Sequence, residues 1–445
     1  MAEAHRSSSN GSTDQRGEAD RDGQNGHLPR EPRDPIPSEA VATIPTSGGC
    51  RPTSTERRIA LVCNRFGDGV AGGAEVVMHE LGRGLRARGW LVDVLASAAR
   101  DLYTWHNELP EGESWEHDLR VLRFRTEMSC GSDRERIGQR IGFGAAVSLA
   151  EQYRWINGSV RVPGMHRYLV DHASDYQAIV FAPYLFWTTF ACAEIAPDRT
   201  VLFPCLHDEP PAYLEIFKPM FEGSRGILFQ TEPEAKLAAR IFHLPPRSAV
   251  VGSGIRVPAS YDPDGFRRKH GLSGDFLFFA GRREWGKGWL ELMAHLEFAN
   301  SVLERPLSLV TCGVGDVGPA PANTRIVDLG YLSDEERSNA MAAATAYVQP
   351  SAMESFSRTI MEAWLAETPV IANGASAVVT WHCARSEAGL VYQDRYEFAE
   401  CLRLLTSEPA LVGAMTRRGR AYVLDHYQWP EVLDRVEASL GEWVA

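Results

Sequence analysis

The sequence predicts an α/β protein built from two doubly wound parallel-sheet domains, and three observations lead to this prediction. A length of 445 residues exceeds what one hydrophobic core usually serves, so two domains are expected. From Arg58 onward, short apolar runs alternate with amphipathic stretches, as they do in strand-helix-strand units. A segment rich in Gly, Pro and Asp, residues 252–265, interrupts this alternation and indicates an interdomain linker.

The first domain is predicted for residues 58–255. Its apolar runs are typical of buried parallel strands, and they comprise residues 59–63, 91–96, 178–182, 201–205, 226–229 and 249–251. Residues 75–88 and 232–242 are amphipathic and predict helices between these strands. Residues 101–161 fit the alternation poorly, so we expect an irregular insertion there.

The second domain is predicted for residues 256–428. Its strands are expected at residues 275–280, 307–312, 325–330, 344–349, 369–372 and 389–392. Residues 429–445 predict an amphipathic helix, which we expect to pack back toward the first domain, with Val432, Val436, Leu440 and Val444 at helical spacing. Residues 1–57 contain no Phe, Trp or Tyr and predict a disordered tail.

Composition excludes several classes of function. A net charge of -12 argues against nucleic acid as a partner, because a phosphate-backbone binder needs a dominant basic face. The eight cysteines stand singly, without the C-x-x-C spacing of a zinc or dithiol site. No apolar run approaches the ~18 residues that a membrane span needs, and the start lacks a secretory signal, so we expect a cytoplasmic protein.

Two glycine-rich motifs match nucleotide-binding patterns incompletely. Residues 67–72 read G-x-G-x-x-G, but the second strand ends at Ala96-Ser97 without the acidic residue that a dinucleotide site needs. Residues 281–288 resemble a P-loop up to Gly288, where magnesium binding would require Ser or Thr. What remains is a strand-end loop whose Arg282 and Lys287 can both reach one diphosphate.

The carboxylates Glu354 and Glu362 are the main candidates for a ligand site. The predicted strand 344–349 is followed by Pro350, and we expect a helix to begin near Ser355. Glu354 would then stand at the carboxyl edge of the sheet, where open α/β folds bind ligands, with Glu362 two turns along the same helix. The pair could hold hydroxyls at opposite ends of one elongated ligand, with phosphates at the helix N-terminus between them.

The ordered motifs from Arg58 to the end resemble the retaining glycosyltransferases of family 4, which have the GT-B fold of two Rossmann-like domains facing a cleft. The resemblance rests on the order and spacing of Gly72-Gly73-Ala74-Glu75, His207-Asp208, Gly281-Arg282, Lys287-Gly288, Leu329-Gly330-Tyr331-Leu332, Glu354-Ser355-Phe356, Glu362-Ala363 and Pro369-Val370-Ile371-Ala372. It implies transfer of a sugar from a nucleotide-diphosphate sugar to an acceptor hydroxyl, with retention of the anomeric configuration.

The resemblance also implies roles for the matched residues in the donor site. Arg282 and Lys287 would bind the diphosphate and stabilise the charge of the leaving nucleotide. Glu362 would hold the ribose, and the loop at Tyr331-Leu332 would frame the base. Glu354 would contact hydroxyls of the transferred sugar, and Ser355 and Phe356 would also belong to the donor-binding site.

On the other side of the cleft, Gly72 and Gly73 would pass close to the donor phosphate and acceptor, and His207 would lie by the sugar and acceptor. Because the departing phosphate is thought to accept the acceptor proton, no protein nucleophile is assigned. Neither a metal nor another cofactor is expected. Two positions depart from the family, which commonly has Gly at Ser357 and at Glu367.

Several alternatives stay open. The acceptor could be a glycan, a lipid-linked sugar or a small molecule, and the sequence identifies neither the donor nor an oligomeric state. The chain could instead be a catalytically silent GT-B binding protein or a sugar-nucleotide epimerase. Nine arginines near Trp155 and Tyr168 could form a peripheral membrane surface at the inner face of the membrane, or a solvated face paired with Glu116, Asp133 and Glu135. These arginines are Arg120, Arg123, Arg125, Arg134, Arg136, Arg140, Arg154, Arg161 and Arg167.

Overall fold

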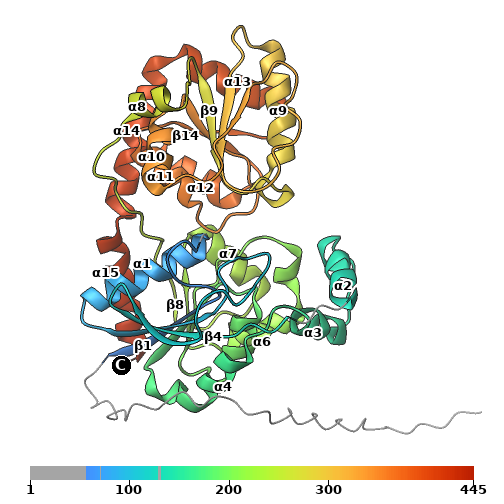
Figure 1. The fold of residues 1–445 in the computed structure, drawn as a ribbon, viewed down its shortest axis with the longest axis vertical. Helices are drawn as coiled ribbons and strands as arrows, with labels where there is room; N and C mark the ends of the chain where they lie inside the picture. Colours follow the sequence, from blue (N-terminus) through green and yellow to red (C-terminus); the bar gives the residue numbers. More distant parts are fainter. Residues whose placement is uncertain (1–56, 71, 129–131, 445) are drawn as a thin grey trace, which may run out of the picture. The chain divides into compact units, whose positions relative to one another are not determined.

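The computed structural model describes residues 57–70, 72–128 and 132–444 of the chain, which fold into two α/β sheet domains (Figure 1). The predicted tail, residues 1–57, lies outside the described residues except for Arg57. The fold class is confirmed, because each domain contains a mainly parallel sheet with helices on both faces. None of the helices within the described ranges is long and apolar enough to cross a membrane.

The first sheet has the strand order β3-β4-β2-β1-β5-β6-β7-β8. Its strands are β1 (Arg58–Cys63), β2 (Leu91–Ser97), β3 (Gly112–Glu116), β4 (Leu119–Phe124), β5 (Ala178–Ala182), β6 (Thr200–Leu202), β7 (Gly226–Phe229) and β8 (Ser248–Val250). Its helices are α1 (Gly73–Ala87), α2 (Ser132–Gly142), α3 (Leu149–Asn157), α4 (Pro163–His172), α5 (Trp187–Cys192), α6 (Lys218–Gly223) and α7 (Glu232–Ile241). The strands pair in parallel except for β3, which runs antiparallel to β4.

The prediction of an irregular insertion at residues 101–161 is wrong. β4 extends the parallel sheet beside β2, and β3 returns along β4 as an edge strand. The hydrophobic pattern concealed β4 because Arg120 and Arg123 interrupt its apolar residues. Both charges are compensated: Arg120 Nη1 lies 3.1 Å from Asp93 Oδ2, and Arg123 Nη2 lies 2.7 Å from Glu116 Oε1.

The second sheet is entirely parallel, with the order β11-β10-β9-β12-β13-β14. Its strands are β9 (Phe276–Ala280), β10 (Ser308–Cys312), β11 (Ile326–Asp328), β12 (Ala346–Gln349), β13 (Val370–Asn373) and β14 (Gly389–Tyr392). Its helices are α8 (Pro263–Lys269), α9 (Trp289–Val302), α10 (Asp334–Ala343), α11 (Arg358–Leu365), α12 (Ala377–Ser386), α13 (Arg395–Ser407) and α14 (Pro409–His426). Along β9, Phe276 and Phe278 face one hydrophobic core, and Leu277 and Phe279 face the other.

The last helix, α15 (Trp429–Val444), packs on the first sheet domain. Val432, Val436 and Leu440 are buried in the same core as β1 and α1. The fit is close at two glycines, because an added Cβ would lie 2.4 Å from Leu433 at Gly84 and 2.7 Å from Trp443 at Gly226. The α15 helix therefore adds apolar surface to a domain whose strands lie more than 170 residues earlier in the chain.

Candidate functional site

The loops that follow β9 and β12 meet through Lys287 and Glu354. These two strands are neighbours in the sheet, so their carboxyl ends lie at one edge. Lys287 Nζ donates a 2.7 Å hydrogen bond to Glu354 Oε1, and the two side chains are 26% and 11% exposed. Burial by itself would raise the pKa of Glu354, but the charge and the hydrogen bond of Lys287, together with the charge of His207, outweigh burial and lower the pKa. Glu354 is therefore an ionised acceptor beside a cation.

Gly288 makes the contact between these loops possible. It caps α9 in the left-handed conformation, with φ of 69°. A Cβ at this position would lie 2.4 Å from the carbonyl oxygen of Pro350, which precedes the Glu354 loop. Close backbone approach thus explains why glycine stands where a P-loop would have Ser or Thr.

The prediction that Glu354 and Glu362 stand on one helix is wrong. α11 begins at Arg358, and its cap residue Ser357 has φ of 66°, so the chain turns sharply between the two carboxylates. Glu362 accepts hydrogen bonds from Arg337 of α10, from Nε at 3.1 Å and from Nη2 at 3.3 Å. Burial alone would lower the pKa of Arg337, but the charges of Glu362 and Asp334 and the hydrogen bond to Glu362 together raise it above its usual value. The Arg337 fork holds the carboxylate in place.

Ser355 and Phe356 have structural contacts that the sequence did not indicate. Ser355 Oγ accepts a hydrogen bond from Gln230 Nε2 at 3.0 Å, and its carbonyl oxygen accepts one from Thr231 Oγ1 at 3.1 Å. Phe356 is 2% exposed and packs edge-on against His382 and Tyr427. The side chain of Phe356, a residue predicted to bind the donor, therefore lies in the core and anchors the loop after Glu354.

Arg282 and Arg283 differ in their surroundings. Arg282 is 42% exposed and pairs with Glu284 at 3.1 Å, so its guanidinium can turn toward a ligand. Arg283, which the sequence did not single out, is buried and bonded to Asp328 Oδ2 and to the Gly315 carbonyl oxygen, each at 3.0 Å. Arg283 thereby ties the loop after β9 to β11 and to the loop after β10. Because the two arginines are adjacent in the sequence, no sequence pattern distinguished the exposed Arg282 from the buried Arg283.

The predicted strand at residues 201–205 would place His207 two residues beyond a strand end. β6 instead ends at Leu202, so His207 lies five residues beyond it. Its nearest charged partner is Glu209, at 3.7 Å, and not its neighbour Asp208. Asp208 accepts a 2.7 Å hydrogen bond from Tyr213 and lies 3.4 Å from Arg240. His207 and its neighbour Asp208 therefore have different partners, and His207 lies within electrostatic range of Glu354.

A cavity of about 870 Å³ lies between the glycine-rich loop, α1, α10 and α11. Of the predicted site residues, it is lined by Gly72, Gly73, Tyr331, Leu332 and Glu362. The other predicted residues lie outside its lining, namely His207, Arg282, Lys287, Glu354, Ser355 and Phe356. The cavity thus gathers the residues expected near the ribose, base and acceptor, and it reaches Gly281 at the end of β9, the strand whose following loop carries Lys287.

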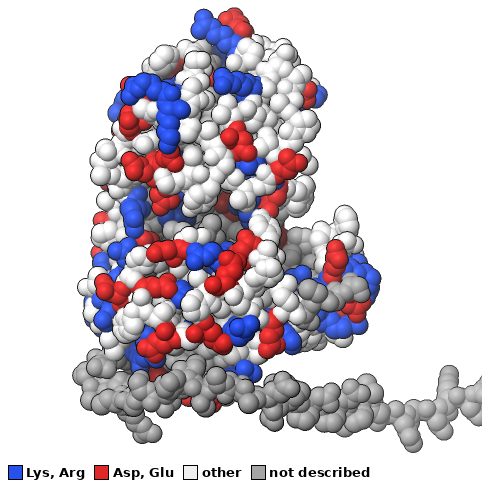
Figure 2. Space-filling view, viewed as in Figure 1, with Lys and Arg blue, Asp and Glu red and all other residues white. Residues whose placement is uncertain are grey.

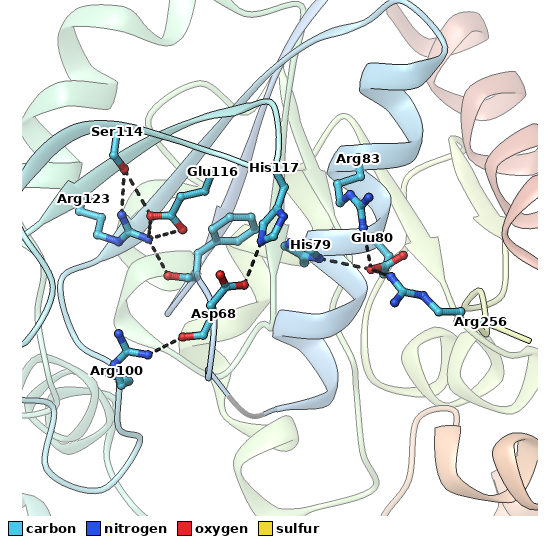
Figure 3. A network of polar contacts seen from close by, with 11 residues as sticks. Asp68, His79, Glu80, Arg83, Arg100, Ser114, Glu116, His117, Arg123 and Arg256 are labelled. Carbon is cyan, nitrogen blue, oxygen red and sulfur yellow. Dashed lines mark hydrogen bonds and ion pairs between the residues drawn. The ribbon is translucent and has the colours of Figure 1, made fainter. Parts of the chain in front are cut away.

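The glycine-rich loop at the cavity wall is held by arginines (Figure 3). Arg123 Nη2 donates to the Phe66 carbonyl oxygen at 2.9 Å, and Arg100 donates to that of Asp68. A Cβ at Gly67 or Gly69 would lie 3.0 Å from the Arg123 or the Arg100 guanidinium, respectively. Glycine at positions 67 and 69 therefore leaves room for the two guanidinium groups, so these two glycines of the G-x-G-x-x-G pattern have a structural role that needs no dinucleotide.

Among the residues considered for a membrane surface in the first domain, the two aromatic residues contact the protein itself. Trp155 is 9% exposed, and Tyr168 stacks on His172. Acidic partners within 4 Å are seen for Arg120, Arg123, Arg136, Arg140, Arg154 and Arg161. Basic and acidic side chains are interspersed on the face shown in Figure 2. The contacts support the solvated, paired interpretation.

Within the part of the chain that the structure describes, no group of three or more His, Cys, Asp or Glu residues is placed to hold a metal ion.

Comparison with known proteins shows similarity to glycosyltransferases. Residues 275–408 match the family model described as glycosyl transferases group 1. The D-inositol 3-phosphate glycosyltransferase 1 of Catenulispora acidiphila is 29% identical over 254 residues, which cover 52% of this chain and 60% of the relative. The matched region thus spans less than two thirds of that relative's length.

Two solved structures have the same fold. Sucrose-phosphate synthase from Thermosynechococcus elongatus has a TM-score of 0.65 at 16% identity, covering 87% of this chain and 99% of the other. Anabaena HepE in complex with UDP and glucose has a TM-score of 0.64 at 15% identity, covering 87% and 100%. The chain therefore has the GT-B fold, and its second sheet domain is similar to the group 1 glycosyl transferases.

Proposed function

We propose that the chain is a glycosyltransferase that moves a sugar from a nucleotide-diphosphate sugar to an acceptor hydroxyl, with retention of configuration. The observation that carries the proposal is the Lys287–Glu354 pair, which places a cation and an ionised carboxylate at adjacent strand ends. The carboxylate can accept hydrogen bonds from sugar hydroxyls, and the cation can face a diphosphate. The similarity of residues 275–408 to group 1 glycosyl transferases supports the same assignment.

In the proposed reaction, the bond between the anomeric carbon and the diphosphate oxygen breaks, and its electron pair leaves with the nucleoside diphosphate. The acceptor hydroxyl oxygen forms the new bond on the same face of the sugar, and its proton passes to the departing phosphate. Lys287 and the exposed Arg282 offset the negative charge that grows on this phosphate. Glu362, held by Arg337, receives the ribose hydroxyls.

For the donor, a uridine diphosphate sugar is the first choice to test, because the fold neighbour HepE was solved with UDP and glucose. For the acceptor, we propose a small hydrophilic molecule. The α1 side of the cavity has the polar residues Glu75, His79, Glu80 and Arg83, which suit hydroxyl or charged groups better than a lipid chain. The similarity to an inositol phosphate glycosyltransferase agrees with this choice.

A panel of nucleotide sugars, screened first by thermal shift and then by release of nucleoside diphosphate, tests the proposal. We expect one donor to stabilise the protein and to be hydrolysed slowly without acceptor. Lys287→Ala should abolish that release, and Lys236→Ala, on the exposed side of α7, should not. Binding without release in the presence of any acceptor would indicate a silent binding protein. A donor whose sugar is altered without transfer would indicate an epimerase.

A further inference from the structure

The buried carboxyl group of Glu234 connects two segments that lie far apart in the sequence. Glu234 stands in the first turn of α7 and is 1% exposed. Its Oε1 accepts a 2.7 Å hydrogen bond from the backbone N–H of Leu206, and its Oε2 accepts a 2.6 Å bond from that of Gln230. Burying a carboxyl group is costly unless its hydrogen bonds are made, so these two backbone groups fix its position.

Both segments lead directly to predicted site residues. Leu206 immediately precedes His207. Gln230 and Thr231 donate from their side chains to Ser355, which immediately follows Glu354. Thr231 Oγ1 also accepts the Glu234 backbone N–H at 3.2 Å as the cap of α7, so its own hydroxyl hydrogen is free to reach the Ser355 carbonyl oxygen.

The contacts form one buried chain of hydrogen bonds from the first sheet domain to the second. Gln230, Thr231 and Ser355 are all buried, and α7 packs against α12 of the second domain (Figure 1). A buried polar chain in which each member is bonded fixes relative positions more tightly than apolar packing does. An apolar residue at position 234 would fill the space but leave the Leu206 and Gln230 amides without their acceptor.

We propose that Glu234 is a positioning residue that holds the His207 segment and the Glu354–Ser355 loop in register, so that the site is assembled from both sheet domains. The inference rests on the proposed glycosyltransferase function. It implies that Glu234 acts on turnover through Leu206, Gln230 and Ser355, without contact to either substrate.

The test compares Glu234→Gln with Glu232→Gln, an exposed carboxylate in the same helical turn whose partner is the exposed Lys236. Gln preserves the size of Glu234 but replaces one acceptor oxygen with an NH2 group, which breaks one backbone bond. We expect Glu234→Gln to lower kcat at least tenfold, with the donor KM within twofold, and Glu232→Gln to match wild type. A purely structural role would lower thermal stability and leave kcat per folded molecule unchanged, which would overturn the proposal.

Two further measurements keep the test independent of folding and of turnover. Ser355→Ala combined with Glu234→Gln should reduce kcat by less than the product of the two single effects, because both act through the same chain. Hydrogen exchange of residues 204–210 and 353–358 should rise in Glu234→Gln and not in Glu232→Gln. Unchanged exchange at residues 353–358 would refute the link even if wild type proved to have no transferase activity, so the two proposals fail separately.

Discussion

Arg337 and Glu362 face each other across α10 and α11 as a two-point ion pair, with Nε to Oε2 at 3.1 Å and Nη2 to Oε1 at 3.3 Å. Arg337 also lies 3.0 Å from Asp334, whose side chain is almost fully exposed. Arg337 thus makes one partly buried and one exposed ion pair, and we expect the two pairs to contribute differently to the free energy of unfolding.

We predict that Arg337→Met lowers the free energy of unfolding by about 2 kcal/mol, because it leaves the Glu362 carboxylate partly buried without its cation. Asp334→Asn removes only the exposed pair and should change the free energy of unfolding by less than about 0.5 kcal/mol. Urea unfolding of the three proteins measures both values. Equal effects of the two substitutions would contradict the distinction.

Lys287 is expected to matter for rate more than for stability. In Lys287→Met the leaving diphosphate loses a cation, so kcat should fall about 100-fold or more, as for removal of a preorganised charge in other active sites. Lys287→Arg should recover part of the rate, because the charge is kept and the geometry is altered. Release of nucleoside diphosphate under saturating donor measures each kcat. A rate within threefold of wild type in Lys287→Met would argue against this role.

Glu367 and Ser357 occupy left-handed backbone positions, with φ of 56° and 66°, at the two ends of α11. We predict that Glu367→Gly raises the free energy of unfolding by about 1 kcal/mol, because glycine adopts this conformation without strain. Ser357→Gly should gain less, since the 2.6 Å hydrogen bond from Gln349 to the serine hydroxyl is lost. Thermal and urea unfolding measure both.

A matched control for these substitutions is Ala366→Gly, at φ of -78°, where glycine should destabilise the protein by about 0.5–1 kcal/mol. Stabilisation by Ala366→Gly as large as by Glu367→Gly would mean that the left-handed conformation is not the cause.

His382 should make stability depend on pH. Burial lowers the pKa of His382 from 6.5 to about 3, so between these values the unfolded chain binds a proton that the folded protein excludes. The free energy of unfolding should therefore decrease as the pH falls from 6.5 toward 3, by up to ~1.4 kcal/mol per pH unit. Urea unfolding at pH 7, 5.5 and 4.5 measures the slope.

His382→Phe should flatten this dependence, because phenylalanine has no titratable group and its ring can pack within the aromatic cluster of Phe356, Tyr422 and Tyr427. His243→Phe, at an exposed position, should leave the slope unchanged. An identical slope in His382→Phe and wild type would assign the pH dependence to other groups.

The positions of most strands were predictable because a parallel strand buried on both faces is an apolar run in the sequence. β5, β7 and β14 begin and end at the predicted residues. β4 was missed because Arg120 and Arg123 break its apolar pattern, and Asp93 and Glu116, which compensate these charges, belong to other strands. The apolar pattern of a segment therefore does not predict a strand whose charged side chains are paired with residues of other strands.

The candidate site could be predicted as a set of residues but not as a geometry. The sequence pointed to Lys287, Glu354 and Glu362, yet it placed the carboxylates on one helix and Phe356 at the ligand. The left-handed Ser357 separates the carboxylates, and Phe356 points into the core. Glu234 carried no signal, because its backbone partners belong to segments whose proximity depends on the folded chain.

The sequence by itself determined the two-sheet architecture and the chemical types available at the strand ends, because alternating apolar patterns and strand-end loops are local properties. The tertiary structure decided which of these groups meet. Lys287 and Glu354 are 67 residues apart and touch only because β9 and β12 are sheet neighbours, and Arg337 reaches Glu362 only because α10 packs beside α11. Such pairings follow from strand order and helix packing, which are set by contacts over the whole domain rather than by any short segment of the chain.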